Sequence, residues 1–300
     1  MNTDYTHITF LLDRSGSMQK VKDDTIGGFN SFIKAQKKID KPATMSFYQF
    51  DDRFEPNYLF KPLKEVEELN DSSFQPRGWT CLLDAIGRAI VETGEALNSL
   101  KEENKPGKVV FVVQTDGKEN RSKEFTHEDI TKLVKQQGDQ YQWEFVFLGA
   151  KLEAVKKAED WGIKSSNTMQ YAHNARGMSG VMCAVSSNLA SYRSGGKADM
   201  SFEQKDRDVQ KEAGVEMQNQ STKIPNPKEK NWQSDWKKFS SYYNKTAEGK
   251  AKIDEAKKRV EAFGQSINAV TKPVPPKPHL PENTTAKNAS WYQKLFSKAK

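Results

Sequence analysis

Short apolar runs alternate with segments of helical periodicity along most of this 300-residue chain. Continuous apolar runs are typical of strands buried on both faces of a parallel sheet, whereas apolar residues every three or four positions indicate amphipathic helices. Strands are predicted at residues 7–12, 45–50, 57–60, 108–115, 143–150 and 168–172. Helices are predicted at residues 29–36, 82–97, 126–138, 152–161 and 177–192. This alternation predicts an α/β fold with a Rossmann-like, mostly parallel, doubly wound sheet.

One of these helices carries both a start and a stop signal. Thr126 is a favoured N-cap residue, and Asp129 stands three positions later. Gly138 follows the last residues of the periodic stretch, and a glycine there is a common helix end. We therefore expect the helix to begin after Thr126 and to stop at Gly138.

The pattern changes after Arg193, where we expect the first domain, residues 1–193, to end. Residues 194–231 are polar with few apolar anchors and predict a linker or partly ordered extension. Residues 232–269 return to helical spacing and predict a pair of amphipathic helices. Residues 270–300 combine a proline-rich spacer with a last short amphipathic segment. The sheet domain is thus expected to carry a helical, partly disordered C-terminal extension.

The net charge of +7 is unevenly distributed. Residues 221–300 hold 17 Lys and Arg against 7 Asp and Glu, while residues 1–220 hold 30 against 33. The basic character therefore belongs to the tail and does not describe the partner of the main domain. A basic tail permits nucleic-acid binding through counterion release, so residues 221–300 are a candidate for that role.

Two cysteines, Cys81 and Cys183, lie in apolar, helical-looking stretches without metal or disulfide spacing. This pattern predicts buried free thiols and fits a reducing compartment. The N-terminus has no basic region before its short apolar run, and nowhere do 18 apolar residues follow one another. We therefore expect neither secretion nor a membrane span, and a cytoplasmic location.

The sequence "FLLDRSGSM" places Asp13, Ser15 and Ser17 at alternate positions directly after the first predicted strand. Taken alone, this spacing is compatible with an Asx or serine turn, a phosphate site or a cation site. Gly16 permits a tight backbone turn that would point both serine hydroxyls the same way.

Two further pieces favour the cation site. Thr80, in "PRGWTCLLDAI", follows a glycine-containing loop and opens a predicted helix, and Asp116, in "VVQTDGKEN", directly follows a predicted central strand. Loops at the carboxyl ends of parallel strands line a common crevice, where hydroxyls and carboxylates supply the oxygen ligands that hard cations prefer. The expected cofactor is Mg²⁺, with Mn²⁺ or Ca²⁺ as alternatives.

These three pieces resemble the metal-ion-dependent adhesion site (MIDAS) of von Willebrand factor type A (VWA) domains. The resemblance covers about residues 5–193, and "WEFVFLGAKLEA" with "SYRSGG" is similar to a prokaryotic or phage branch of the family. It implies that Ser15, Ser17 and Thr80 supply hydroxyl oxygens, and that Asp13 and Asp116 bind the cation directly or through water. It also implies a non-enzymatic, intracellular adaptor or assembly factor whose protein partner adds a carboxylate to the cation.

Trp79 departs from the family pattern, which most often has a second glycine before the threonine. Its indole either stands exposed as a partner contact or turns inward and displaces Thr80. Lys118 and Arg121 are further candidates for contacts with an acidic partner. Asp84, in the first turn of its helix, is expected to stabilise the helix start or orient a ligand rather than bind the metal.

The four histidines, His7, His127, His173 and His279, have no Cys or His companions at ligand spacing, so we expect surface or core roles for them. An aspartate after a first parallel strand also describes haloacid-dehalogenase-like phosphatases, which use a second aspartate two residues later as acid and base. Ser15 occupies that place here. Metal-dependent phosphoryl transfer thus remains an alternative function, and the family resemblance adds an AAA+ ATPase as a candidate partner.

Overall fold

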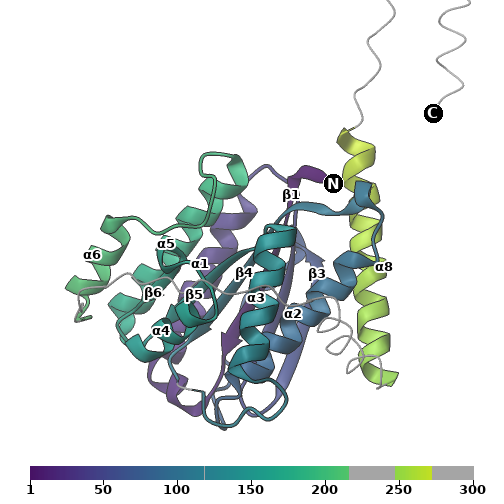
Figure 1. The fold of residues 1–300 in the computed structure, drawn as a ribbon. Helices are drawn as coiled ribbons and strands as arrows, with labels where there is room; N and C mark the ends of the chain where they lie inside the picture. Colours follow the sequence, from purple (N-terminus) through teal and green to yellow (C-terminus); the bar gives the residue numbers. More distant parts are fainter. Residues whose placement is uncertain (118, 216–246, 272–300) are drawn as a thin grey trace, which may run out of the picture. The chain divides into compact units, whose positions relative to one another are not determined.

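The computed structural model describes residues 1–117, 119–215 and 247–271 of the chain. Its centre is a six-stranded sheet with the strand order β3-β2-β1-β4-β5-β6 (Figure 1). All neighbouring strands pair in parallel except β2 and β3, which pair antiparallel at one edge. The strands are β1 (Asn2–Asp13), β2 (Ala43–Phe50), β3 (Phe54–Pro62), β4 (Pro106–Thr115), β5 (Glu144–Gly149) and β6 (Thr168–Gln170).

Helices cover both faces of the sheet and enclose two separate apolar cores. Helices α1 (Lys22–Lys37) and α5 (Ala175–Ser194) pack on one face, and α2 (Leu82–Asn98), α3 (His127–Tyr141) and α4 (Leu152–Asp160) on the other (Figure 1). Short 3-10 turns precede or follow several elements: η1 (Gly16–Val21), η2 (Leu63–Glu65), η3 (Glu102–Asn104) and η4 (Ser165–Asn167). The predicted doubly wound, mostly parallel α/β sheet is confirmed.

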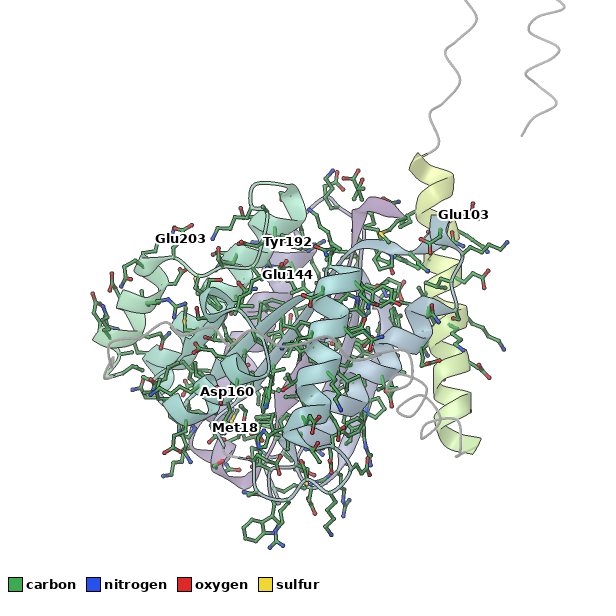
Figure 2. All side chains as sticks on the ribbon, viewed as in Figure 1. Met18, Glu103, Glu144, Asp160, Tyr192 and Glu203 are labelled. Carbon is green, nitrogen blue, oxygen red and sulfur yellow. The ribbon has the colours of Figure 1, made fainter. Side chains whose placement is uncertain are left out.

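Strands β1 and β4 lie side by side at the centre of the sheet. Their register pairs Phe10 with Val112 and Leu12 with Gln114, so both strands finish at the same edge. Their apolar side chains are buried on both sides, which explains why these segments read as continuous apolar runs. In Figure 2, Met18 in the turn after β1 is labelled in the lower part of the molecule, and Tyr192 near the end of α5 in its upper part. The carboxyl edge near Met18 is where the candidate site residues gather.

Helix α3 begins as predicted but ends later. The Thr126 hydroxyl accepts a hydrogen bond from the Asp129 N–H, and the Asp129 side chain accepts one from the Thr126 N–H. The predicted stop at Gly138 is wrong, because the helix continues to Tyr141 and ends where Gln142 adopts a left-handed conformation with φ of 55°. The N–H groups of Gln142 and Trp143 both donate to the Gln137 carbonyl, which turns the buried Trp143 toward β5.

Packing against the sheet continues beyond Arg193, where the sequence predicts the first domain to end. Met200 and Phe202 are buried in the core beneath α1 and α5. In the short helix α6 (Gln204–Glu212), the buried Gln210 amide accepts from the Ala172 N–H and donates to the Gly177 carbonyl, each at 3.1 Å. Residues 194–215 of the predicted linker or partly ordered extension are therefore packed, with Met200, Phe202, Gln210 and Val215 buried.

The last described helix, α8 (Ala247–Thr271), overlaps the predicted helical pair and ends two residues beyond it. Ala256 and Val260 are buried in the core on the α2 side of the sheet, and the Phe263 ring meets the Tyr5 ring edge-on at 5.3 Å. The first predicted helix of the pair lies mostly outside the described residues, as does nearly all of the proline-rich C-terminal segment. Among the described helices, none is long and apolar enough to cross a membrane.

The prediction of buried thiols is wrong for Cys183, which is exposed, and Cys81 is only half-buried. Both cysteines are unpaired. The neighbours Met182 and Ala184 are buried, and the turn of α5 between them directs Cys183 to the outside. An apolar neighbourhood in the sequence therefore does not place a residue on the inner face of a helix.

A layer of buried polar side chains lies between β1 and α2. The His7 Nδ1 atom is 2.9 Å from the Thr44 hydroxyl, and the Thr9 hydroxyl is 3.2 Å from that of Thr93. The His7 ring also stacks on Phe60, with 3.9 Å between the ring centroids. Burial lowers the pKa of His7 to about 3, so this imidazole stays neutral in the folded protein. Of the two roles that the sequence left open for His7, surface or core, the structure shows the core role.

Replacing His7 with glutamine should remove part of the acid sensitivity of folding. Because the pKa of His7 is lowered to about 3 in the folded state, only the unfolded chain takes up this proton as the pH falls below about 6.5. The free energy of unfolding should therefore fall between pH 7 and pH 5 by about 2 kcal/mol more in the wild-type protein than in His7→Gln. Urea unfolding of both proteins at the two pH values measures this difference. An equal pH effect in both proteins would contradict it.

Candidate metal centre

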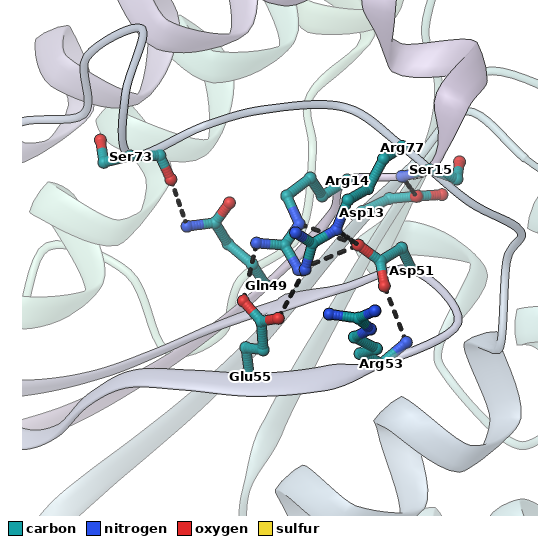
Figure 3. Close-up of polar contacts among 9 residues, drawn as sticks. All are labelled: Asp13, Arg14, Ser15, Gln49, Asp51, Arg53, Glu55, Ser73 and Arg77. Carbon is teal, nitrogen blue, oxygen red and sulfur yellow. Dashed lines mark hydrogen bonds and ion pairs between the residues drawn. The ribbon is translucent and has the colours of Figure 1, made fainter.

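Asp13 is the last residue of β1 and is fully buried. One carboxylate oxygen accepts a hydrogen bond from the Ser15 N–H at 2.7 Å, as Figure 3 shows. The other accepts from the Thr115 hydroxyl at 2.5 Å. These two bonds hold the carboxylate at the end of the strand and begin the tight turn into η1.

Ser17 connects this turn to the end of β4. Its hydroxyl donates to Asp116 Oδ1 at 2.7 Å, and its oxygen lies 3.2 Å from the Ser15 hydroxyl oxygen. Asp116 directly follows β4 and is buried, whereas Ser17 is exposed. The two strand ends therefore share one polar cluster that reaches the surface through Ser17.

Thr80 enters the cluster from a third segment, the loop before α2. A Cβ atom added at Gly117 would stand 2.9 Å from the Thr80 hydroxyl oxygen and 3.5 Å from Asp13 Oδ2. The hydroxyl and the carboxylate thus face one small space that the missing side chain of Gly117 leaves free. The structure brings all five residues of the sequence-predicted ligand set together at this edge: Asp13, Ser15, Ser17, Thr80 and Asp116.

The two buried carboxylates concentrate negative charge at the cluster. Burial, and then the nearby charge of Asp116, raise the pKa of Asp13 to about 7. Arg14 does not neutralise Asp13, because its guanidinium bonds to Asp51 and Glu55 instead. Within the described residues, no Lys or Arg side chain forms an ion pair with Asp13 or Asp116. A divalent cation would offset the repulsion between the two carboxylates.

The donor set has the chemistry of a hard-cation site, because its side-chain donors are hydroxyl and carboxylate oxygens. Over the residues that the structure describes, no group of three or more His, Cys, Asp or Glu side chains is arranged to hold a metal. A cation at this edge would therefore depend on the hydroxyl oxygens of Ser15, Ser17 and Thr80. Residues of this kind suit Mg²⁺, Mn²⁺ or Ca²⁺ better than metals that prefer sulfur or nitrogen.

An ion-pair network fixes the loop that leads to Thr80 (Figure 3). The Asp51 carboxylate accepts from the Nε atoms of Arg14 at 3.1 Å and Arg77 at 3.0 Å, and the Glu55 carboxylate bonds to both guanidinium groups. The Arg77 N–H also donates to the Arg14 carbonyl at 2.8 Å. The segment containing Arg77 is thereby attached to the Asp13–Ser17 turn.

Gly78 lets the loop before Thr80 pass close to Asp52 and to the turn that contains Gly16. Its φ is +67°, and a Cβ atom there would come within 2.3 Å of Asp52 Oδ1. Its carbonyl accepts a hydrogen bond from the Gly16 N–H at 3.3 Å. Both the backbone conformation and the close approach require glycine at this position.

The loop after β4 holds Thr80 from the other side. Asn120 and Thr80 exchange two hydrogen bonds, each of 3.2 Å, between the Thr80 backbone and the N–H and side chain of Asn120. The Asp84 carboxylate accepts from the N–H groups of residues 123, 124 and 125, and Glu119 accepts from the Leu83 N–H. Asp84 therefore organises this loop, and its contacts are with backbone rather than with the oxygen cluster.

Three neighbours of the cluster were not identified from the sequence. The sequence carries a signal for Thr115, which stands next to Asp116, and for Asp51, which directly follows the last residue of β2. His173 has none, because its position depends on where β6 joins the sheet. Its Nε2 atom lies 3.0 Å from Asp116 Oδ2, which places this histidine beside the cluster.

Of the predicted partner contacts, Trp79 is 56% exposed, so its indole does not turn inward and displace Thr80. The Arg121 guanidinium lies 4.6 Å from the centre of the Trp79 ring. Lys118 lies outside the described residues.

No family model and no curated protein sequence matches this chain. Among solved structures, proximal thread matrix protein 1 (PTMP1) from the mussel byssus aligns with a TM-score of 0.45 and 16% identity, over 63% of this chain and 47% of that one. Another PTMP1 structure, with a zinc-occupied MIDAS motif, has a TM-score of 0.41 and 13% identity over 62% and 46% of the two chains. The pilus adhesin SpaC from Lactobacillus rhamnosus GG has a TM-score of 0.46 and 11% identity over 63% and 30%. The alignment covers less than half of each of these proteins.

Substituting Gly78→Ala should lower the free energy of unfolding by about 1–3 kcal/mol, because alanine must adopt a left-handed conformation and push Asp52 aside. The matched control is Gly27→Ala in α1, where an added Cβ meets nothing within 4 Å. That change should raise the free energy of unfolding by up to about 1 kcal/mol through helix propensity. Urea unfolding of the two variants tests the pair, and equal effects would contradict the strained role of Gly78.

Proposed function

We propose that this chain is a VWA-type, Mg²⁺-dependent protein-binding module. The observation that carries the proposal is the convergence of three hydroxyls and two buried carboxylates, from three separate segments, at the carboxyl edge of a parallel sheet. Ser15, Ser17 and Thr80 would hold the cation together with Asp13 and Asp116. The partner would supply an aspartate or glutamate to complete the coordination.

The donor types support binding of a partner carboxylate. Mg²⁺ takes about six oxygen ligands, and the three hydroxyls of this set carry no charge. If the two aspartates act through water, the cation keeps a strong attraction for one more carboxylate. The exposure of Ser17 and Trp79 means that this end of the site is open to a partner.

The surroundings of Asp13 favour binding over phosphoryl transfer. Both of its carboxylate oxygens accept hydrogen bonds, and the side chain is fully buried, so it is poorly placed as a nucleophile. Ser15 stands where an acid and base would be needed, and a serine hydroxyl is a poor substitute for a carboxylate. We therefore propose a non-enzymatic role. Phosphatase activity that disappears in Asp13→Asn would contradict it.

The family resemblance also predicts an intracellular adaptor, a cytoplasmic location and an AAA+ ATPase as one candidate partner. These remain predictions. So does nucleic-acid binding by the basic tail, most of which lies outside the described residues.

The native protein should capture a partner from cell lysate in Mg²⁺ and release it when EDTA removes the cation. Asp13→Ala and Thr80→Ala should each abolish capture, because each removes an oxygen that faces the cation position. Circular dichroism should show that both variants keep the native fold. Capture that continues unchanged in EDTA would contradict the proposed function.

Gly117→Ala should weaken Mg²⁺ binding at least tenfold without unfolding the protein. The added methyl group would occupy the space between Thr80 Oγ1 and Asp13 Oδ2, at 2.9 and 3.5 Å from these atoms. Isothermal titration calorimetry with Mg²⁺, Mn²⁺ and Ca²⁺ measures the effect and ranks the three cations. Gly27→Ala, a glycine-to-alanine change in open space, is the control and should bind normally. Unchanged affinity in Gly117→Ala would show that the cation does not bind there.

A further inference from the structure

A groove of about 510 Å³ lies next to the candidate metal centre. Its walls come from three segments: the turn between β2 and β3, the start of α2 with the loop before it, and the loop after β4. Trp79 and Cys81 both line the groove, and the residue between them is Thr80 of the metal centre. A ligand that reaches the cation at Thr80 is therefore only a few ångströms from the groove, because successive Cα atoms are about 3.8 Å apart.

The groove carries an excess of positive charge. Arg53, Arg121 and Lys123 are exposed in its lining, and across the described part of the chain none of them pairs with a carboxylate. The remaining charges are mostly compensated: Arg88 pairs with Glu124. The Asp84 carboxylate accepts three backbone N–H groups, which leaves Asp52 as the one exposed acid of the lining.

Aromatic rings pack against two of the arginine side chains of the groove. The Arg121 guanidinium lies over the exposed Trp79 ring at 4.6 Å, and the Arg88 guanidinium lies over the Phe54 ring at 5.8 Å. A stacked guanidinium keeps its N–H edge free for a carboxylate and loses little side-chain freedom when one binds.

We propose that this groove binds an acidic segment of the partner protein. One carboxylate of the segment would reach the cation, and further carboxylates a few residues away would meet Arg121 and Lys123. The proposal rests on the proposed function, since it uses the same cation to place the first carboxylate. A protein segment fits better than nucleic acid, because Asp52 and the Arg88–Glu124 pair interrupt the positive charge that a phosphate backbone would need.

Two fluorescein-labelled peptides test the proposal by fluorescence anisotropy in Mg²⁺. Both contain one aspartate in a glycine chain. A pair of adjacent residues begins three positions after the aspartate, and this pair is Glu-Glu in one peptide and Gln-Gln in the other. At low ionic strength the glutamate peptide should bind about fivefold more tightly, as expected for two exposed charge pairs. The difference should shrink as NaCl is added.

The double variant Arg121→Gln with Lys123→Gln should bring the two affinities within about twofold, while Mg²⁺ binding stays native. The control removes two exposed positive charges outside the groove, Lys156→Gln with Lys157→Gln in α4, and should keep the full preference. Circular dichroism of both double variants checks that they are folded.

The remaining outcomes separate the two proposals. Equal affinity for the two peptides, with both lost in EDTA, would overturn the groove proposal and leave the proposed function standing. Binding of both peptides that persists in EDTA and in Asp13→Ala would overturn the proposed function. The labelled glutamate peptide can also be displaced by a twelve-nucleotide oligothymidylate or by the unlabelled glutamate peptide. Displacement by the oligothymidylate at the lower concentration would overturn the choice of a protein segment.

Discussion

The parallel pairing of β1 with β4 is the constraint on which the candidate site depends. It brings Asp13 and Asp116, far apart in the sequence, to one edge of the sheet, where both are buried. Burial, and then repulsion from the Asp116 carboxylate, raise the pKa of Asp13 to about 7. Hydrogen bonds from Ser15 and Thr115 to Asp13, and from Ser17 to Asp116, offset only part of the unfavourable energy of burying these two charges. The proposed cation would compensate the remaining negative charge. The topology of the sheet is thereby linked to the chemistry at its edge.

The surrounding loops are held by polar contacts before any ligand arrives. On one side Arg14 and Arg77 share the carboxylates of Asp51 and Glu55, and on the other Asn120 exchanges two hydrogen bonds with Thr80. A site fixed in this way loses less conformational freedom on binding than a flexible loop would. The loop before α2 and the loop after β4, which these contacts hold, also form two of the three walls of the groove.

Most of the fold was predictable from the sequence, because burial on both faces imposes apolar runs on central strands and a stripe of apolar residues on each covering helix. The prediction was weaker where a local signal permits a structure without requiring it. Gly138 lies within α3, since the chain turns only at Gln142. Residues 194–215 look polar along the sequence, although Met200, Phe202, Gln210 and Val215 are buried in the folded protein.

The sequence by itself determined the side-chain types of the candidate site and their place at strand ends, since Asp13, Ser15, Ser17 and Asp116 follow apolar runs and Thr80 opens a helix. Only the tertiary structure decided which side chains meet. The contact of His173 with Asp116, the pairing of Arg14 with Asp51 rather than Asp13, and the outward position of Trp79 each depend on elements distant in the chain. The physical reason is that spacing along a chain reports local conformation, whereas contact between loops depends on the order and register of the strands that carry them.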